Sequence, residues 1–589
     1  MNSYPLIRNR WSNEHLLAVL FFAVSLYQLP DWTSSAVSVL PYFLIVAAAL
    51  FLDAAINYIR YSEPVCAVSS AVTAAVLYPV IKGLPGWAGL LGVAAALIIG
   101  KHIWGGTGKN IFNPAVISMF FLSMLFPMGL DLFKPSYLLL PAMLLSLPFI
   151  AVRLFPGAGL MTGMLAALFM TNSLDAWSFA AYGAIYWSCT VITDPATATD
   201  KPIAGLLLGF AAGFIPMYFS PSLLALSSAL LVFNLLSYMV DGYLGRKKGI
   251  HLSGIKLKSP LEPMKPSVEA IDLTGDKECT EGDWRALEPE TILQRIRDNE
   301  VFGMGGAGFS TVTKIETAIK SGAKEKYLVI NGMECDPGLI HDKWLVHNRQ
   351  AEIRKGIEVL TRLAGFNKIY YIAKDTGGID LPKQVEIKLM PDRYPFGAEK
   401  LFVKKLLGID IAYGSNPAQY GVLVLNVQTV FSIYEAVCCN KKADTRFITA
   451  AELFTGTARV ARVRLGERID DIAEKTVGDK GITFVGGGIM QAHPALEGEV
   501  VERTTNFIAA GMLPRYKESH QCINCGLCRL CCPRGLNVKK IAELLDEGRQ
   551  LEAQTYNYGG CISCGLCSYV CPAGRNLSGR MAQKKPETV

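Results

Sequence analysis

CINCGLCRLCCP, residues 522–533, and CISCGLCSYVCP, residues 561–572, are two copies of one pattern, C-x2-C-x2-C-x3-C-P. This spacing is typical of a pair of [4Fe–4S] clusters, in which the fourth cysteine of each run ligates the cluster of the other run. A disulfide framework or a zinc site is the alternative, but zinc sites usually pair CxxC units across longer gaps. Cys531 is predicted to be a spare thiol. The predicted ligand sets are Cys522, Cys525, Cys528 and Cys571 for one cluster, and Cys561, Cys564, Cys567 and Cys532 for the other.

Composition separates the chain into an apolar N-terminal part and a more polar remainder. With 589 residues and 51% hydrophobic residues, the chain exceeds the size of one domain and the apolarity of an ordinary soluble protein. The net charge of +7 is explained by basic residues that flank membrane spans, and no basic–aromatic patch indicates a nucleic-acid partner. Fifteen cysteines, more than half of them in the two runs, indicate a reducing compartment for the C-terminal part.

Residues up to about 241 form a series of apolar stretches, and a membrane-spanning helix needs about 20 such residues. The first stretch, 16–29, lacks a small-residue cleavage site, so an uncleaved helix is expected rather than a signal peptide. Several stretches are short, so one or two are candidates for re-entrant or broken helices. A membrane α-helical bundle in a lipid bilayer is predicted, with about ten spans at 15–30, 36–57, 64–81, 85–100, 111–130, 135–152, 157–173, 176–192, 203–219 and 222–241.

The distribution of charge predicts how this bundle is oriented. The loops opposite to the N-terminus carry only Lys82 and Lys134. By the positive-inside rule, both termini and the soluble half then lie in the cytoplasm, and the bundle lies in the inner (cytoplasmic) membrane. The ten basic residues on the N-terminal side are Arg8, Arg10, Arg60, Lys101, Lys109, Arg153, Lys201, Arg246, Lys247 and Lys248.

Two segments inside the bundle are unusually polar: GGTGKNIFNPA, residues 105–115, and TDPATATDKP, residues 193–202. Polar backbone at membrane depth persists only where protein or a water-filled cavity covers it. Either these segments are cytoplasmic turns with helix-capping residues, or they form a cofactor or ion site at broken helices. They resemble the D subunit of the Rnf electron-transport complex and its relative, the B subunit of the sodium-pumping NADH:quinone reductase. The resemblance covers about residues 15–245 and implies a bundle of about ten helices that carries flavin.

One feature of that family is missing from this chain. The family attaches FMN through a phosphoester to a threonine in an S-G-A-T-like motif, on a long loop between the two polar segments. Here the stretch 133–192 is compact and holds no such motif, and Thr162 and Thr171 lie in apolar segments. The departure argues against a further, covalent flavin in the membrane half.

Residues 246–285 are rich in proline, lysine and glutamate and are predicted to form an extended, solvated linker. A helix-like pattern then leads into GMGGAGFST, residues 303–311. Consecutive glycines let backbone amides approach a phosphate, and a helix that starts after the turn would favour an anion at its N-terminus. A tight structural turn is the alternative, because the loop fits neither a Walker A motif nor a dinucleotide fingerprint.

Two apolar strands are predicted to end in polar residues. The strand 327–330 leads to Glu334 and Asp336, and the strand 421–425 leads to Asn426. Such residues are usual at the ligand edge of an open α/β sheet, although Glu334 and Asp336 could instead cap the next helix. The domain is predicted to be α/β, because these strands alternate with helical segments and with further strands at 369–373 and 482–485.

Together these motifs resemble the C subunit of the Rnf complex and, more distantly, the FMN- and NADH-binding subunit of respiratory complex I. The glycine loop matches G-x-G-G-A-G-F-P-T with Ser310 in place of proline. Residues 331–343 match N-x-x-E-x-E-P-G-x-x-x-D-R, with Asp336 for the second glutamate and Lys343 for arginine. The resemblance covers about residues 285–580, and it implies that the cluster domain is α-helical.

The resemblance also implies the cofactors and the residues that contact them. It implies non-covalent FMN and a site for NADH or NAD in the soluble half, beside the two [4Fe–4S] clusters. Glu334 and Asp336 are the implied catalytic residues. The implied cofactor-binding residues are Gly303, Gly305, Gly306, Ala307, Gly308, Phe309, Thr311, Lys314, Asn331, Gly397, Glu399, Asn426 and Thr429.

The predicted domains are a D-like membrane domain (1–245), the linker (246–285), a C-like FMN/NADH-binding domain (286–510) and a two-cluster iron–sulfur domain (511–589). The C subunit of the family begins with a barrel-sandwich domain of lipoyl-like shape, of which only a trace remains at 249–251. Direct fusion to the membrane half is one candidate for replacing its docking role.

The resemblance predicts a membrane-bound oxidoreductase subunit that passes electrons between NAD(H), FMN and the clusters, with ion translocation as an implied extension. Its implied partners are other membrane subunits of an Rnf-like complex and ferredoxin or another redox protein. The alternative is a non-pumping, membrane-anchored NADH-dependent reductase that delivers electrons to quinone, a corrinoid or another reductase. A transporter with an iron–sulfur sensor is a third hypothesis. It is disfavoured because the spans offer few charges, with Asp53 and Asp131 near their ends.

Overall fold

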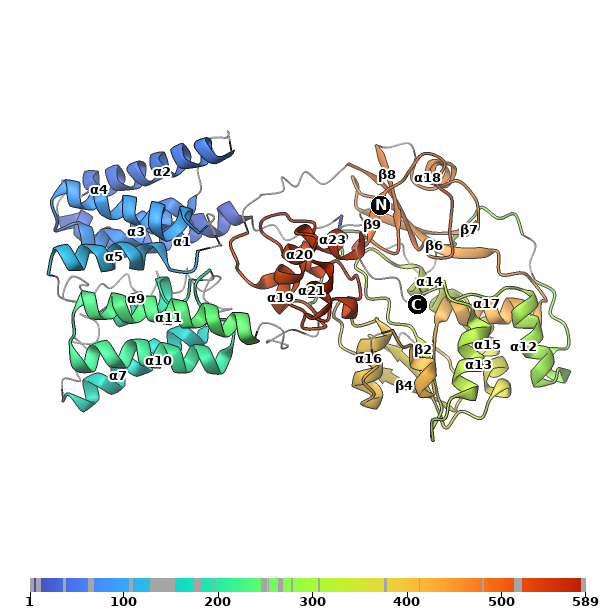
Figure 1. Ribbon diagram of the computed structural model, residues 1–589. Helices are drawn as coiled ribbons and strands as arrows, with labels where there is room; N and C mark the ends of the chain where they lie inside the picture. Colours follow the sequence, from blue (N-terminus) through green and yellow to red (C-terminus); the bar gives the residue numbers. More distant parts are fainter. Residues whose placement is uncertain are drawn as a thin grey trace.

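The computed structural model divides the chain into three parts that follow one another in space (Figure 1). A helical bundle from the N-terminal half lies at one end, and an α/β domain lies at the other. The small domain that carries the cysteine runs lies between them. The structure describes residues 5–6, 12–34, 39–61, 68–104, 108, 110–127, 154–172, 183–194, 196–244, 252, 254–262, 268–276, 279–305, 308–375, 379–412, 414–478, 481–512 and 522–583.

The helices of the bundle fall on predicted spans. Within the described ranges, three helices are long and apolar enough to cross a membrane, at Val39–Ile59, Pro202–Phe219 and Leu223–Leu244. The predicted span 135–152 lies outside the described residues, so the count of about ten spans stays a prediction. The helices are α1 (Asn13–Ser34), α2 (Val39–Tyr61), α3 (Val68–Ile81), α4 (Gly86–Ala95), the π-helix η2 (Ala96–His102), α5 (Pro114–Leu125), α7 (Leu154–Met170), α9 (Ala184–Thr190), α10 (Pro202–Phe219) and α11 (Leu223–Leu244).

Glycines bring α7 and α10 into backbone contact. Gly159 and Gly163 on α7 and Gly209 on α10 lie in this contact. A Cβ atom added to Gly163 would come 2.2 Å from the Phe210 carbonyl oxygen, and one added to Gly209 would come 2.3 Å from the Pro156 carbonyl oxygen. Small residues four apart let helix backbones approach closely, which is typical of helix packing inside membranes.

The α/β domain is built on two sheets. The first is an all-parallel sheet in the order β4-β3-β2-β5, which confirms the strands predicted around residues 327, 369 and 421. Its strands are β2 (Tyr327–Asn331), β3 (Lys368–Ala373), β4 (Val385–Leu389) and β5 (Val422–Asn426). The helices of this part are α12 (Pro289–Asp298), α13 (Thr311–Lys320), α14 (His341–Asn348), α15 (Gln350–Leu363), α16 (Glu399–Leu407) and α17 (Val427–Cys438).

The second sheet has six strands in the order β1-β7-β6-β10-β8-β9 and mixes parallel with antiparallel pairs. Helix α18 (Ile469–Thr476) packs beside it. The strand predicted at 482–485 is confirmed as β8. The strands are β1 (Ile271–Asp272), β6 (Thr445–Glu452), β7 (Thr457–Arg464), β8 (Ile482–Gly486), β9 (Ala492–Pro494) and β10 (Phe507–Gly511).

The prediction of a solvated linker over residues 246–285 is wrong for part of that segment. Strand β1 pairs in parallel with β7, and Leu261 is buried in the core of the soluble half. A disulfide joins Cys279 to Cys439, which the prediction of a reducing compartment did not anticipate. The composition correctly indicates extended backbone, but extended backbone also pairs readily with the free edge of a sheet. The trace of the barrel-sandwich domain at 249–251 lies outside the described residues.

The cluster domain is helical, as the resemblance implied. The helix-like segment predicted at 538–554 forms two helices, and its Leu544 and Leu545 are buried against Tyr558. The helices are α19 (Leu527–Leu530), α20 (Val538–Asp546), α21 (Gln550–Gln554), α22 (Leu566–Tyr569) and α23 (Leu577–Gln583).

The N-terminal residues contact the soluble half before the chain enters the bundle. The Leu6 amide donates a hydrogen bond of 2.9 Å to the Ile489 carbonyl oxygen, and the Leu6 side chain is buried in the same core as Cys564. The beginning of α1 also packs against the cluster domain, through Leu16 and Ile523. The N-terminus and the soluble half therefore lie at the same end of the bundle, which agrees with the predicted placement of both on one side.

We expect Gly163→Leu and Gly209→Leu to force α7 and α10 apart, because the added side chains would collide with backbone atoms that cannot move independently. Overpacking of this kind typically costs about 1–3 kcal/mol. Both variants should lower the thermal unfolding midpoint in detergent. The matched control is Gly242→Leu on α11, since nothing lies within 4 Å of a Cβ atom at Gly242. Equal thermal unfolding midpoints for Gly163→Leu, Gly209→Leu and Gly242→Leu would contradict the close packing of α7 on α10.

Candidate functional site

Strands β2 and β5 end side by side at the predicted ligand edge. Asn331 and Asn426 are register partners at the last position of these parallel strands. The Asn331 Oδ1 atom accepts a hydrogen bond from the Met333 amide at 2.9 Å. Asn426 caps α17, with Oδ1 accepting from the Gln428 amide at 2.8 Å. Two predicted cofactor-binding residues are therefore brought together, at the N-terminus of a 12-residue helix.

The glycine loop closes over this edge. The Gly303 amide donates to the Phe309 carbonyl oxygen at 2.7 Å, which shapes a closed turn. A Cβ atom at Gly305 would come 3.2 Å from the Asn426 Cβ atom, so a larger residue would crowd the loop against the strand end. The Met304 amide donates to Thr429 Oγ1 at 2.9 Å and fastens the loop to α17. The predicted residues Gly306 and Ala307 lie outside the described residues.

The remaining predicted cofactor-binding residues border the same region. Lys314 Nζ lies 2.7 Å from Glu399 Oε1, and the Gly397 carbonyl oxygen accepts from Asn331 Nδ2 at 3.1 Å. Gly308 has a left-handed φ of 62°, and the neighbouring Phe309 side chain is 65% exposed. Thr311 is buried at the start of α13. The structure thus brings the described residues of the predicted flavin site together around one loop and one sheet edge.

A buried arginine that the sequence did not single out supports the loop. Arg446, on β6, donates from Nη2 to the Met304 carbonyl oxygen at 3.2 Å and from Nη1 to the Arg503 carbonyl oxygen at 2.5 Å. Burial lowers the pKa of Arg446 to about 9, so the guanidinium is still charged at neutral pH. This buried positive charge lies behind the loop where a phosphate is expected. No local sequence pattern distinguishes Arg446 from other arginines on strands.

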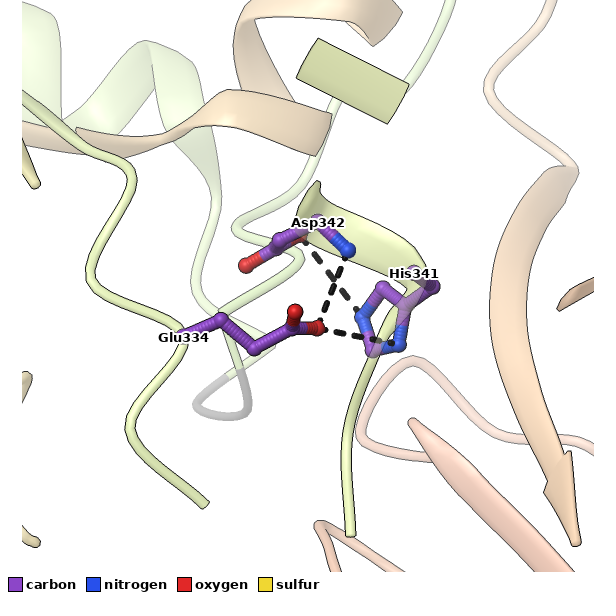
Figure 2. Close-up of side chains that lie close together, drawn as sticks. All are labelled: Glu334, His341 and Asp342. Atoms are coloured by element: carbon purple, nitrogen blue, oxygen red, sulfur yellow. Dashed lines mark hydrogen bonds and ion pairs between the residues drawn. The ribbon is translucent and has the colours of Figure 1, made fainter. Parts of the chain in front are cut away.

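Glu334, His341 and Asp342 form a buried group behind the loop (Figure 2). Glu334 accepts hydrogen bonds from the amides of Asp342 at 3.0 Å and Lys343 at 3.3 Å, at the first turn of α14. This confirms the helix-capping alternative for Glu334. His341 Nδ1 lies 3.8 Å from Glu334 Oε1, and its Nε2 lies 3.7 Å from Asp342 Oδ1. Asp342 Oδ2 accepts from Asn426 Nδ2 at 2.6 Å, which ties the group to the ligand edge.

Burial controls the protonation of this group. It raises the pKa of Glu334 to about 8, with a further increase from the charge of Asp342, and it raises the pKa of Asp342 to about 6. Burial lowers the pKa of His341 to about 3, so the imidazole is neutral. Two carboxylates and an imidazole are also a donor set for a divalent cation. Backbone amides already donate to the Glu334 carboxylate.

Asp336 faces away from the glycine loop. Its carboxylate accepts hydrogen bonds from the amides of Gly338 at 2.8 Å, Ile489 at 3.1 Å and Met490 at 3.2 Å. Burial raises the pKa of Asp336 to about 6, although these three amides lower it. Asp336 therefore fastens the turn between β8 and β9 rather than lining the loop. Its predicted catalytic role stays a prediction.

The same turn contacts the second cysteine run. Gln491 Nε2 donates to the Ser563 carbonyl oxygen at 2.7 Å, and the Tyr394 hydroxyl donates to the Cys564 carbonyl oxygen at 2.6 Å. A Cβ atom at Gly565 would come 2.5 Å from the Met490 carbonyl oxygen. The loop 561–565 is therefore packed directly on the α/β domain, which we call the flavin-type domain after its predicted FMN site.

The cysteines fall into two groups that agree with the crossed ligand sets. The thiols that act electrostatically on Cys528 are Cys525, Cys522 and Cys571, whereas those that act on Cys564 are Cys561 and Cys532. Burial raises the pKa of the Cys528 thiol well above its ordinary value, so a set of such thiolates requires a cationic partner. We call Cys522, Cys525, Cys528 and Cys571 the bundle-side thiols, and Cys561, Cys564, Cys567 and Cys532 the flavin-side thiols.

The first cysteine run contacts the bundle. Arg529 forms an ion pair with Asp200, and Asn524 Nδ2 lies 3.5 Å from the Ala196 carbonyl oxygen. Both partners belong to the polar segment 193–202. The other polar segment joins the same place, because Asn113 Nδ2 donates to Asp194 Oδ2 at 3.1 Å while Asn113 Oδ1 caps α5. The polar segments therefore lie where the cluster domain meets the bundle.

A cavity of about 110 Å³ lies at this junction. Its wall includes Ile523, which stands between two bundle-side thiols, and Lys101 from the bundle. The polar segments supply a helix cap at Asn113 and also line this cavity, and a cofactor or ion site there stays a prediction. Further lining residues are Leu17, Ser69, Thr73, Asn110, Cys189 and Asp194.

The threonines considered for covalent flavin are engaged elsewhere. Thr162 Oγ1 donates to the carbonyl oxygens of Ala158 and Gly159 at 3.0 Å, and Thr171 Oγ1 donates to that of Ala167 at 3.0 Å. Both hydroxyls are thus bonded to the backbone of α7.

Fold and sites define a class: a protein with a membrane bundle, an α/β domain of the flavin-binding type and a domain with paired cysteine sets. Family comparisons divide the chain in the same way. Residues 2–136 match the NQR2, RnfD, RnfE family, 296–435 match the Nuo51 FMN-binding domain, and 515–572 match the 4Fe-4S dicluster domain. The chain is therefore a fusion of a part similar to the D subunit and a part similar to the C subunit of the Rnf complex.

Individual relatives cover the C-terminal part. The C subunit of the ion-translocating oxidoreductase complex of Haemophilus influenzae is 30% identical over 274 residues, 43% of this chain and 41% of the relative. The C subunit from Pseudomonas aeruginosa is 30% identical over 292 residues, 46% of this chain and 37% of the relative. The chain spans less than half the length of these curated relatives. A chain of an NAD+-reducing [NiFe]-hydrogenase aligns with 18% identity and a TM-score of 0.35, covering 51% of this chain and 63% of that chain.

We expect Glu334 to contribute a loss of stability of the soluble half as the pH rises from about 4.5 to about 8, because its raised pKa keeps a proton in the folded state that the unfolded chain releases. Glu334→Gln should remove this loss. The variant should match the parent at pH 4 and unfold at a higher temperature at pH 9. Glu290→Gln, at an exposed site on α12, is the control and should behave as the parent. A parent-like pH profile for Glu334→Gln would contradict the assignment.

Proposed function

We propose that this chain is a membrane-bound electron-transfer subunit that passes electrons between NAD(H), FMN and two [4Fe–4S] clusters, within an Rnf-like complex. One observation carries the proposal. The flavin-side thiols are packed on the turn held by Asp336, and the bundle-side thiols are packed on the polar segments of the bundle. The cysteine sets thus lie in series between the flavin-type domain and the membrane.

The residues at the ligand edge fit FMN. The glycine loop approaches Asn426, the N-terminus of α17 points to the same edge, and Arg446 supplies a buried positive charge. A helix N-terminus and a buried cation favour a phosphate. FMN supplies the exchange between nicotinamide, which carries two electrons, and clusters, which carry one. The exposed ring of Phe309 offers a face for a second planar group such as nicotinamide.

The thiols fit two clusters with the crossed sets predicted from the sequence. Each set offers four cysteines, and each cluster of this type takes four. We place the chain in the inner membrane with its soluble half in the cytoplasm, since the start of α1 and the segment 193–202, which belong to the side with the predicted excess of basic residues, contact the cluster domain. Other membrane subunits would cover the apolar outer faces of the bundle, and ferredoxin or another redox protein would exchange electrons with the soluble half.

The proposal predicts that NADH reduces flavin and clusters in anaerobically purified protein. Asn426→Ala should lose most of the bound flavin and the reduction by NADH, because it removes both the helix cap and the side chain against which the glycine loop packs. Asn416→Ala is the matched control, since Asn416 is also a helix-capping asparagine but lies on the surface. If dithionite reduces the parent protein and NADH does not, NADH is not the direct donor.

Removing one bundle-side thiol should remove one cluster only. For Cys525→Ala we expect about half the iron and sulfide of the parent, with the flavin content unchanged, because the flavin-side thiols do not include Cys525. Cys531→Ala is the control, since Cys531 is buried beside the ligands but belongs to neither predicted set. Full iron content in Cys525→Ala, or half in Cys531→Ala, would require a different ligand assignment.

A further inference from the structure

Three ionisable side chains meet inside the bundle. Lys101 Nζ lies 2.9 Å from Asp53 Oδ1, and His102 Nε2 lies 2.7 Å from the same oxygen atom. Lys101 also donates to Ser69 Oγ at 3.0 Å and to Ser70 Oγ at 2.7 Å. We call Asp53, Lys101 and His102 the buried charge cluster. Hydropathy alone places Asp53 near a span end and Lys101 in a loop, and it does not reveal this arrangement.

Burying the charge cluster in an apolar bundle costs free energy. The exposed fractions are 0% for Asp53, 3% for Lys101 and 6% for His102. Removing ions from water is repaid only in part by their attraction, so a buried ion pair is weak evidence for a stabilising role. Ionisable groups inside a membrane bundle more often mark a path for ions or protons. Lys101 and His102 also lie on the π-helix η2, a distortion that frequently occurs at functional sites.

The buried charge cluster is connected by a cavity to the domain that carries the cysteine runs. Lys101 lines the cavity of about 110 Å³ at the junction, and Ile523 lines the other side. Ile523 lies between Cys522 and Cys525, two of the bundle-side thiols. The cavity wall is mixed, and its polar members, which include Ser69, Asn110 and Asp194, can hydrogen-bond to water molecules in a cavity of this size. Charge added at the bundle-side thiols would therefore act on the buried charge cluster across this cavity, where electrostatic interactions are stronger than in bulk water.

We propose that the buried charge cluster is a proton-exchange site. It binds one proton when an electron reaches the iron–sulfur cluster that the bundle-side thiols would hold (the bundle-side cluster), and it releases the proton when the electron leaves. This inference rests on the proposed function. Reduction adds one negative charge at the bundle-side thiols, and one proton from water, bound at His102 or Asp53, adds one positive charge in compensation. NADH or another electron donor supplies the electron, and the reverse step returns the proton to water.

The composition of the site favours a proton over a metal cation. Asp53 already faces the ammonium of Lys101, so a sodium ion bound to the Asp53 carboxylate would meet a positive charge beside it. A proton needs no vacant coordination shell and can bind the imidazole of His102 directly. Among the described residues, the other titratable groups that line the connecting cavity are Cys189 and Asp194. Helix α3 contributes Ser69 and Ser70, which contact the buried charge cluster at Lys101.

The test is a redox titration of the full-length protein with its clusters, followed by electron paramagnetic resonance at several pH values. The bundle-side signal is identified as the one lost in Cys525→Ala. In the parent protein the ratio of reduced to oxidised bundle-side cluster at fixed potential should fall up to tenfold per pH unit, or 59 mV. His102→Gln should flatten this dependence, because glutamine keeps a hydrogen-bonding group beside Asp53 but binds no proton. Asp53→Asn provides a second variant that also removes the carboxylate.

His15→Gln is the matched control, since His15 is exposed and lies near the same junction, one residue before Leu16. It should keep the dependence of the parent. A bundle-side potential that does not change with pH in the parent overturns the inference, whatever the variants do. The inference is also overturned if the potential depends on pH in His102→Gln and in Asp53→Asn as steeply as in the parent. Absence of any cluster signal after dithionite would instead overturn the proposed function, so the two failures are distinguishable.

Discussion

The crossing of the two cysteine runs is the constraint on which the arrangement of this molecule depends. Cys571 lies with the thiols of the first run, and Cys532 lies with those of the second. The helices between the runs, α20 and α21, must therefore fold back into one compact core. Because this core is small and rigid, its two ends can contact different neighbours. One end binds the turn between β8 and β9, and the other binds the polar segments of the bundle.

Fusion in one chain holds the cluster domain between the D-like and C-like parts. In the related complexes the D-like and C-like parts are separate subunits, whereas here the chain holds the cluster domain between them. Leu6 at one end of the bundle and the ion pair of Arg529 with Asp200 both fix the soluble half at the junction. In the membrane half, Lys101 of the buried charge cluster lines the cavity that Ile523 of the first cysteine run also lines.

Local patterns predicted the parts of this protein whose chemistry is local. The cysteine spacing is itself the geometry of a cluster, and the strands that end at Asn331 and Asn426 are apolar runs followed by polar turns. Contacts between distant segments were not predictable in this way. Lys101 appears as a loop charge by hydropathy, and only tertiary packing turns it towards Asp53, 48 residues earlier. Similarly, proline-rich composition indicates extended backbone but does not reveal that β1 pairs with β7.

The order of electron transfer tests the central claim, that the two cysteine sets act in series, most directly. Cys564→Ala should disable the flavin-side cluster and leave the bundle-side cluster intact. Rapid freezing after mixing with NADH, followed by electron paramagnetic resonance, then measures reduction of the bundle-side cluster. We predict that NADH no longer reduces it, while dithionite still does. Reduction by NADH at the rate of the parent protein would show that electrons reach the bundle by another route.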